Sequence, residues 1–221
     1  MLRKIELVII MLIMAGFVIL NKNLGEMVSM DQVKTVEKTV VLDPGHGGGD
    51  PGKVGVNDVV EKDINLEIAV KVKKILEERG IVVIMTRERD EMLEGTKRED
   101  MKKRVEIINK EKPDLTVSIH QNSYTDPEVS GAQTFYYSKS EDGRRYAEQI
   151  QNALLKLDVT NHRKAKSNDN YYLLTRTEVP TVIVECGFLS NKEEAEKLSD
   201  NTYQDEISNA IVDGIESCFG N

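Results

Sequence analysis

The segment VVLDPGHGGGDPG, Val40–Gly52, joins a short apolar run to a loop of glycines and prolines. A β-branched run that ends at Asp43–Pro44 is typical of a strand followed by a loop. His46, one of only three histidines in the chain, lies inside that loop. Either it is a stray side chain in a tight turn, or the glycines let the backbone fold around something that the imidazole holds.

Outward from this segment, apolar runs of strand length alternate with segments of helical periodicity. Strands are predicted at residues 39–42, 81–85, 115–119, 133–137 and 179–184, and helices at 61–79, 97–110, 144–157, 191–199 and 203–218. Several of the strands are continuously apolar, which is typical of parallel strands covered on both faces. We therefore predict an α/β fold with a mostly parallel central sheet, helices on both faces, and a single catalytic domain.

Composition excludes several classes of protein. The chain has 221 residues, 39% of them hydrophobic, and a formal net charge of −8. This hydrophobic content favours a packed core over disorder, and the absence of a basic stripe argues against nucleic acid as a partner. Cys186 and Cys218 lack the CxxC spacing of a thiolate zinc site and do not indicate a disulfide framework.

The N-terminus differs from the rest of the chain. Arg3 and Lys4 precede Leu7–Leu20, a run without a polar side chain that suits a signal segment and is short for a spanning helix of about 20 residues. The basic flank predicts that the N-terminus stays inside and the remainder is exported. No small-residue cleavage site follows Leu20, which favours an uncleaved signal anchor over a cleaved signal peptide.

These patterns predict three regions: a signal anchor or signal peptide at 1–24, a polar linker at 25–38, and a catalytic domain at 39–221. The expected location is the extracytoplasmic face of the membrane, or outside the cell if the segment is removed. The N-terminal segment would then be the link to the membrane.

Four chemically active side chains lie where strands end or a helix begins. His46 follows the first strand, while His120 and Glu185 directly follow two others. Glu61 begins the first long helix, so it belongs to the same edge. Because the carboxyl ends of parallel strands line one crevice, we expect the four side chains to gather there.

Two imidazoles and a carboxylate form the ligand set of a catalytic zinc ion, whose fourth position is left for water. We assign His46, Glu61 and His120 as ligands and Glu185 as the general base. Taken singly, His46 could be a turn residue, His120 a core histidine and Glu61 an ordinary helix-start carboxylate. A purely structural role is less plausible for Glu185, because a carboxylate that ends an apolar strand needs a partner. His162, in a polar stretch, is expected at the surface.

The segments that carry these residues resemble the zinc-dependent N-acetylmuramoyl-L-alanine amidases known as amidase type 3. The matching segments are VVLDPGHGGGDPG, EKDINLEIA, MTRERD, KKRVEIINKEKPDLTVSIHQNS, SGAQTFYY and VPTVIVECGFLSN. The resemblance implies the same fold, Zn²⁺ as cofactor, His46, Glu61 and His120 as its ligands, and Glu185 as the catalytic glutamate. It also implies the reaction, hydrolysis of the amide between the lactyl group of N-acetylmuramic acid and the L-alanine of the peptidoglycan stem peptide.

The layout resembles the spore-cortex, germination-specific subgroup of these amidases. The stretch between Asn122 and Gly131 is too short for the inserted helix that blocks the zinc in division-type relatives. The subgroup implies removal of stem peptides so that muramic-δ-lactam can form, in the forespore intermembrane space. An accessory wall protein or lipoprotein remains an open alternative as a partner.

Two other functions compete with this interpretation. A non-catalytic domain on the same scaffold could bind peptidoglycan or a partner, but such a domain usually loses a site residue, and none of the four is missing here. A zinc carboxypeptidase could act within the stem peptide, but neither His46 nor His120 has a glutamate at the H-x-x-E spacing.

Overall fold

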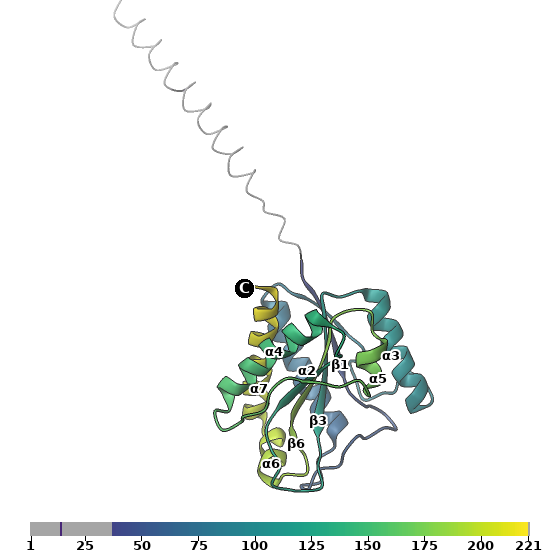
Figure 1. Ribbon diagram of the computed structural model, residues 1–221. Coiled ribbons are helices and arrows are strands. Elements are labelled where there is room, and N and C mark those ends of the chain that lie inside the picture. Colours follow the sequence, from purple (N-terminus) through teal and green to yellow (C-terminus); the bar gives the residue numbers. More distant parts are fainter. Residues whose placement is uncertain (1–13, 15–36, 221) are drawn as a thin grey trace, which may run out of the picture. The chain divides into compact units, whose positions relative to one another are not determined.

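The structure, a computed structural model, describes residues 14 and 37–220. These residues have an α/β fold with one mixed β-sheet that is covered by helices (Figure 1). Residues Lys38–Asn221 form one unit of the chain. The predicted signal anchor or signal peptide and nearly all of the predicted linker lie outside the described residues. Within the described part of the chain, no helix combines the length and the apolar character needed to cross a membrane.

The sheet has six strands in the order β2-β1-β3-β6-β4-β5. The strands are β1 (Thr39–Pro44), β2 (Val82–Met85), β3 (Leu115–Asn122), β4 (Gln133–Tyr136), β5 (Lys166–Ser167) and β6 (Thr181–Phe188). Strands β2, β1, β3 and β6 are mutually parallel, whereas β4 runs antiparallel to β6 and carries β5 parallel to itself. The carboxyl ends of β1, β3 and β6 are therefore neighbours at one edge of the sheet.

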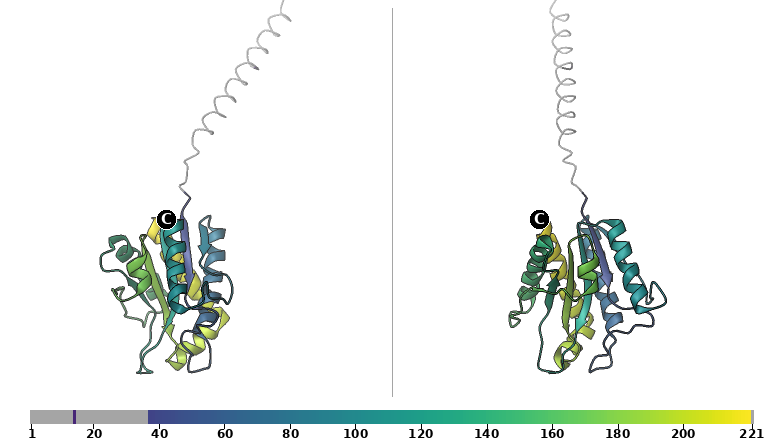
Figure 2. Two further views of the ribbon diagram at one scale, coloured as in Figure 1. Left: turned by 90° about the vertical axis from the view of Figure 1, so that its right-hand side faces the viewer. Right: turned by 45° about the vertical axis from the view of Figure 1, so that its right-hand side comes forward.

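Helices cover both faces of the sheet (Figure 2). They are α2 (Glu61–Glu78), α3 (Lys97–Glu111), α4 (Glu141–Leu157), α5 (Tyr172–Arg176), α6 (Lys192–Ser199) and α7 (Asn201–Phe219). Val40 and Leu42 of β1 face the larger core under α2, α4 and α7, while Val41 packs with Ile108 of α3 and Leu173 of α5. This alternation follows from the two-residue period of a strand, and it explains why Val40, Val41 and Leu42 are all apolar.

Helix α3 begins and ends at recognisable signals. The Thr96 side chain caps the helix: it accepts a hydrogen bond from the backbone N–H of Glu99 and donates one to the Glu99 carboxylate. Lys112, with a φ of 48°, ends the helix in the left-handed conformation just before Pro113. These signals fix which residues form the first turn of α3, next to the site described below.

The structure differs from the sequence prediction at the strand ends. Strands β3 and β6 continue through His120 and Glu185, which are Cα partners in the β3–β6 ladder, so the prediction that both directly follow their strands was wrong. A polar residue ended the apolar pattern but not the backbone pairing. The sequence prediction also missed β5 and α5, because elements of two and five residues carry no readable periodicity.

Candidate active site

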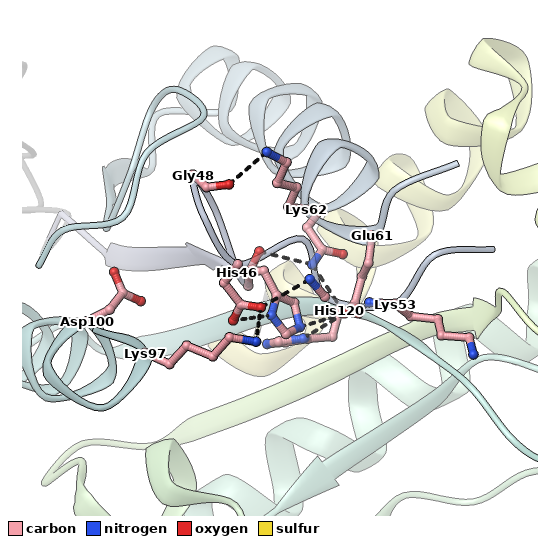
Figure 3. Close-up of polar contacts among 12 residues, drawn as sticks. His46, Gly48, Lys53, Glu61, Lys62, Lys97, Asp100 and His120 are labelled. Carbon is pink, nitrogen blue, oxygen red and sulfur yellow. Dashed lines mark hydrogen bonds and ion pairs between the residues drawn. The ribbon is translucent and has the colours of Figure 1, made fainter. Parts of the chain in front are cut away.

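Three of the four predicted site residues converge at the carboxyl edge of the sheet (Figure 3). Each of His46, Glu61 and His120 offers one ligand atom, and these atoms all lie within 4.8 Å of one another. The Glu61 Oε1 atom is 3.0 Å from His120 Nδ1 and 3.2 Å from His46 Nε2. The carboxylate thus lies between two imidazoles, one from the loop after β1 and one from β3.

Local structure holds the Glu61 carboxylate in this position. Glu61 is the first residue of α2, and only 4% of it is exposed. The backbone N–H of Lys53 donates to Oε2 at 2.8 Å, and that of Gln121 donates to Oε1 at 3.1 Å. Asn65, one turn further along α2, also faces Oε1. These donors fix the carboxylate before any ligand arrives.

The charges of the three residues depend on one another. Burial opposes ionisation of Glu61, but hydrogen bonds to His120 and His46 hold the pKa of its carboxyl far below the usual range. Burial alone would lower the pKa of His120, yet the pairing with Glu61 raises it above the usual value. The cluster therefore favours a cation between its side chains, a proton or a metal ion, and the two would compete.

Asp50 orients His46, and the sequence analysis missed it. His46 Nδ1 lies 2.9 Å from Asp50 Oδ2, so the opposite ring nitrogen, Nε2, is directed at Glu61. A carboxylate behind a histidine in this manner fixes the orientation of a metal-binding imidazole. Lys97 Nζ lies 2.5 Å from Asp50 Oδ1. Burial opposes ionisation of Asp50, but the hydrogen bonds from Lys97 and His46 lower the pKa of its carboxyl below the usual value. The spacing of four residues within HGGGD was the available signal.

Two glycines make room for the cluster. A Cβ on Gly45 would lie 2.1 Å from the His120 ring, and a Cβ on Gly52 would lie 2.5 Å from Glu61 Oε2. Gly52 also has a φ of +68°, which other residues rarely adopt. His46 itself has a φ of 61°, so the loop after β1 holds its key side chain on a strained backbone.

Two buried arginines, Arg87 and Arg104, hold the backbone of this loop. Arg87 donates to the carbonyl oxygens of Pro44 at 2.9 Å and Gly45 at 3.0 Å. Arg104 donates to those of Pro44 and His46, both at 2.7 Å. The two guanidinium groups, 2% and 1% exposed, therefore bind three successive carbonyl groups that end at His46. The sequence analysis assigned them no role.

Arg104 is neutralised by two buried carboxylates. Its guanidinium lies 2.8 Å from Asp43 Oδ1 and 2.7 Å from Asp100 Oδ2. Asp43 also accepts hydrogen bonds from Thr86 and Ser118. Burial opposes ionisation of Asp43, but Arg104 and these hydroxyl groups lower its pKa below the usual value. This network ties β1, β3 and α3 together directly behind the loop.

Glu185 lies beside the three converging residues but is not one of them. It is 7% exposed, and its Oε2 atom has no hydrogen-bond partner among the described residues. Burial raises the pKa of its carboxyl to about 7, and the charge of Glu61 adds to the shift. The Tyr171 phenol interacts with the Glu185 carboxyl; burial raises the pKa of Tyr171 to about 12. A carboxyl with a pKa near 7 can both accept and return a proton at neutral pH.

The donor set of the site fits a divalent transition metal. Two imidazole nitrogens and one carboxylate oxygen suit zinc and leave a coordination position open. Gly52 provides space that any Cβ would fill, and the unpartnered Oε2 of Glu185 is available for a further polar ligand. His162, in contrast, is exposed at the surface, as expected.

A cavity of about 470 Å³ opens beside the cluster. Its lining residues are His46, Asp50, Lys97, Arg98, Asp100, Met101, His120 and Tyr172. The cavity is therefore bounded by the loop after β1, the end of β3, and the first turns of α3 and α5. It gives a molecule from solvent direct access to both imidazoles.

Known sequences resemble this chain over most of its length. A family described as "N-acetylmuramoyl-L-alanine amidase" matches residues 40–217, which include all four predicted site residues. The chain is 42% identical over 190 residues to the germination-specific N-acetylmuramoyl-L-alanine amidase of Bacillus subtilis (strain 168), covering 82% of this chain and 80% of that protein. It is 32% identical to the amidase LytC of the same organism over 83% of this chain and 36% of LytC.

Solved structures share the fold. The CwlD amidase from Clostridioides difficile, solved in complex with the GerS lipoprotein, matches with a TM-score of 0.80 and 40% identity over 83% of this chain and 99% of that one. The amidase AmiC2 of Nostoc punctiforme matches with a TM-score of 0.75 and 32% identity over 83% of this chain and 98% of that one.

Proposed function

Since the chain belongs to the N-acetylmuramoyl-L-alanine amidase family, we propose that His46, Glu61, His120 and Glu185 carry out the reaction of that family with the help of zinc. The chain is a hydrolase that cleaves the amide between the lactyl group of N-acetylmuramic acid and the L-alanine of the stem peptide. The observation that carries the residue assignment is the convergence of two imidazoles and a carboxylate beside the buried carboxyl of Glu185, whose Oε2 atom has no partner among the described residues.

His46, Glu61 and His120 would hold the zinc. When bound, zinc supplies Lewis-acid polarisation of the amide carbonyl and makes water a stronger acid. Asp50 keeps the His46 ring in the binding orientation, and Arg87 and Arg104 keep the loop that carries it in place.

Glu185 moves the proton in this proposal. In its ionised form the carboxylate takes a proton from the attacking water, and in its protonated form it returns that proton to the nitrogen of the leaving L-alanine. The Tyr171 hydroxyl stays protonated throughout the neutral range because its pKa is about 12. It can therefore donate a hydrogen bond to the ionised form of Glu185.

The biological setting proposed for the chain is the spore cortex. The supporting observations are the similarity to the germination-specific amidase of Bacillus subtilis and to the CwlD amidase of Clostridioides difficile. Since the CwlD structure was solved in complex with the GerS lipoprotein, an accessory lipoprotein is the kind of partner proposed here. Action outside the cytoplasmic membrane, with the N-terminal segment as anchor, completes the proposal.

The test compares the full chain with the Glu185→Gln variant, each loaded with zinc and incubated with purified peptidoglycan. Mass spectrometry of wild-type products should give stem peptides with a free L-alanine amine and muramic acid with a restored lactyl carboxylate. We expect Glu185→Gln to bind zinc in full and to hydrolyse at least about 100-fold more slowly, because it cannot accept a proton.

The exposed Glu178→Gln variant is the matched control and should retain wild-type activity. Retained hydrolysis in Glu185→Gln would refute the assigned base. Cuts inside the stem peptide would indicate a peptidase instead. Absence of cleavage by the fully zinc-loaded wild type would support the non-catalytic alternative.

A further inference from the structure

The first turn of α3 forms one wall of the cavity beside the candidate metal ligands. Lys97, Arg98 and Met101 of this helix line the cavity, opposite His46 and His120. Their spacing of three and four residues places all three side chains on one face of α3. Figure 3 shows Lys97 reaching from the helix toward His46. A helix wall thus brings cationic side chains to the edge of the reaction centre.

Lys97 already forms an ion pair. Its Nζ atom lies 2.5 Å from Asp50 Oδ1, and Asp50 in turn holds His46. Asp100, the other carboxylate of the cavity wall, accepts hydrogen bonds from Arg104 and from the backbone N–H of Leu93. Both carboxylates of this cavity therefore already have a cationic partner within the protein.

Arg98 differs from the other charged residues of the cavity. It is exposed, and within residues 37–220 it forms no ion pair. Both wall carboxylates already have cationic partners, so among the described residues that line the cavity Arg98 is the charged side chain left to pair with a ligand. A planar guanidinium in such a position is well suited to bind a carboxylate through two parallel hydrogen bonds.

The substrate carries such a carboxylate on one side of the bond only. On the acyl side, the lactyl carboxyl is consumed in the amide itself, so that side has no ionised group near the reaction. On the amine side, the second stem residue, D-glutamate, is linked through its side chain and keeps a free α-carboxylate. Since an extended residue spans about 3.3–3.6 Å, this carboxylate lies roughly one or two residue lengths from the bond that is cleaved.

We propose that the cavity is the stem-peptide subsite and that Arg98 binds the α-carboxylate of the second stem residue. Arg98 then distinguishes a stem with D-glutamate from one with D-isoglutamine, whose carboxamide is neutral. Met101 and the half-exposed ring of Tyr172 provide apolar wall for the neighbouring peptide. This inference rests on the proposed function, because it takes the substrate from it.

The test uses two synthetic substrates, N-acetylmuramoyl-L-alanyl-D-glutamate and its D-isoglutamine counterpart, with the zinc-loaded full chain. We expect kcat/KM for wild type to favour the D-glutamate substrate by about fivefold to thirtyfold, less than a buried charged hydrogen bond would give, because Arg98 is exposed. Arg98→Gln should reduce this ratio to near one, mainly through a higher KM for the D-glutamate substrate. Arg98→Lys should restore part of it.

Lys102→Gln is the matched control, because Lys102 is an exposed cation of the same helix that does not line the cavity. It should leave the substrate ratio at the wild-type value. A ratio near one in the wild type, or a ratio unchanged in Arg98→Gln, would overturn the proposal.

A second measurement separates this inference from the proposed function. Calorimetry with the free dipeptides L-alanyl-D-glutamate and L-alanyl-D-isoglutamine measures binding without any turnover. Preference for the acidic dipeptide that is lost in Arg98→Gln would support the subsite even if hydrolysis failed. Equal binding of both dipeptides by an enzyme that cleaves peptidoglycan would overturn the subsite and leave the amidase assignment intact.

Discussion

At the scale of single residues, Glu185 shows how burial prepares a side chain for proton transfer. The carboxyl is 7% exposed, and one of its oxygens has no partner among the described residues. An ionised carboxylate in that position is costly, since the lost hydration is only partly replaced. The same burial that raises its pKa to about 7 must therefore lower the stability of the metal-free fold at alkaline pH.

The Glu185→Gln variant should make this cost visible in the metal-free protein. The folded-state pKa of about 7 lies above the usual 4.5, so the protonated form is favoured in the fold, and stability is lost as pH rises from about 4.5 through 7. At pH 8, in the presence of a chelator, we expect the variant to have a free energy of unfolding about 1–3 kcal/mol higher than wild type. At pH 4.5 the two should be nearly equal. Urea denaturation at both pH values measures the difference, and a variant that is less stable than wild type at pH 8 would contradict this account.

At the scale of elements, the loop between β1 and α2 lets the ligand atoms approach one another because some of its residues are glycines, which have no Cβ. Gly52 is the critical position, because a Cβ there would collide with Glu61 Oε2. Gly80, which follows α2, has a similar positive φ of 78° but has nothing within 4 Å of its would-be Cβ. Comparing substitutions at the two glycines therefore distinguishes the effect of backbone strain from the effect of a steric collision with the site.

Substituting each glycine by alanine tests this distinction. Gly80→Ala should lose about 1 kcal/mol of stability, because alanine rarely adopts a positive φ, and Gly52→Ala should lose more, because its Cβ also collides with Glu61. Only Gly52→Ala should also bind zinc more weakly, by about tenfold or more, because Glu61 must move. Competition with a chromophoric chelator measures the affinity. Equal zinc affinity in the two variants would show that the space at Gly52 does not matter for the site.

The elements also show what the sequence could and could not predict. The long helices and central strands were predictable from their periodicity, and chain order alone brought His46, Glu61 and His120 to one edge. The roles of Arg87 and Arg104 were not predictable, because they lie in charge-rich segments where nothing distinguishes a buried arginine from its exposed neighbours. Their function depends on carbonyl groups of the loop after β1, which only the tertiary structure brings into contact with the two arginines.

At the scale of the whole molecule, a metal ion would link separate segments of the chain. His46, Glu61 and His120 belong to three different segments that only the folded chain brings together. A ligand that binds only the folded state stabilises it in proportion to the logarithm of its concentration. Zinc should therefore protect the entire domain and not the loop alone.

Thermal unfolding in a chelator and in excess zinc tests this expectation. At 100 to 1,000 times the dissociation constant, zinc should add about 2.7–4.1 kcal/mol, which corresponds to a rise in Tm of roughly 5–15 °C for a domain of this size. The His120→Ala variant serves as the control and should show little or no rise. An unchanged wild-type Tm, measured by calorimetry, would mean that the cluster does not hold zinc in the folded state.

The parallel pairing of β1, β3 and β6 also has a consequence for the order of events during folding. Parallel neighbours cannot be joined by tight turns, and β3 and β6 are separated along the chain by β4, α4, β5 and α5. Such distant pairings form late and slowly. Because Glu185 reaches the histidines only when β6 pairs with β3, the reaction centre is completed by this late step. The newly made chain therefore cannot hydrolyse the cell wall until β6 has paired with β3.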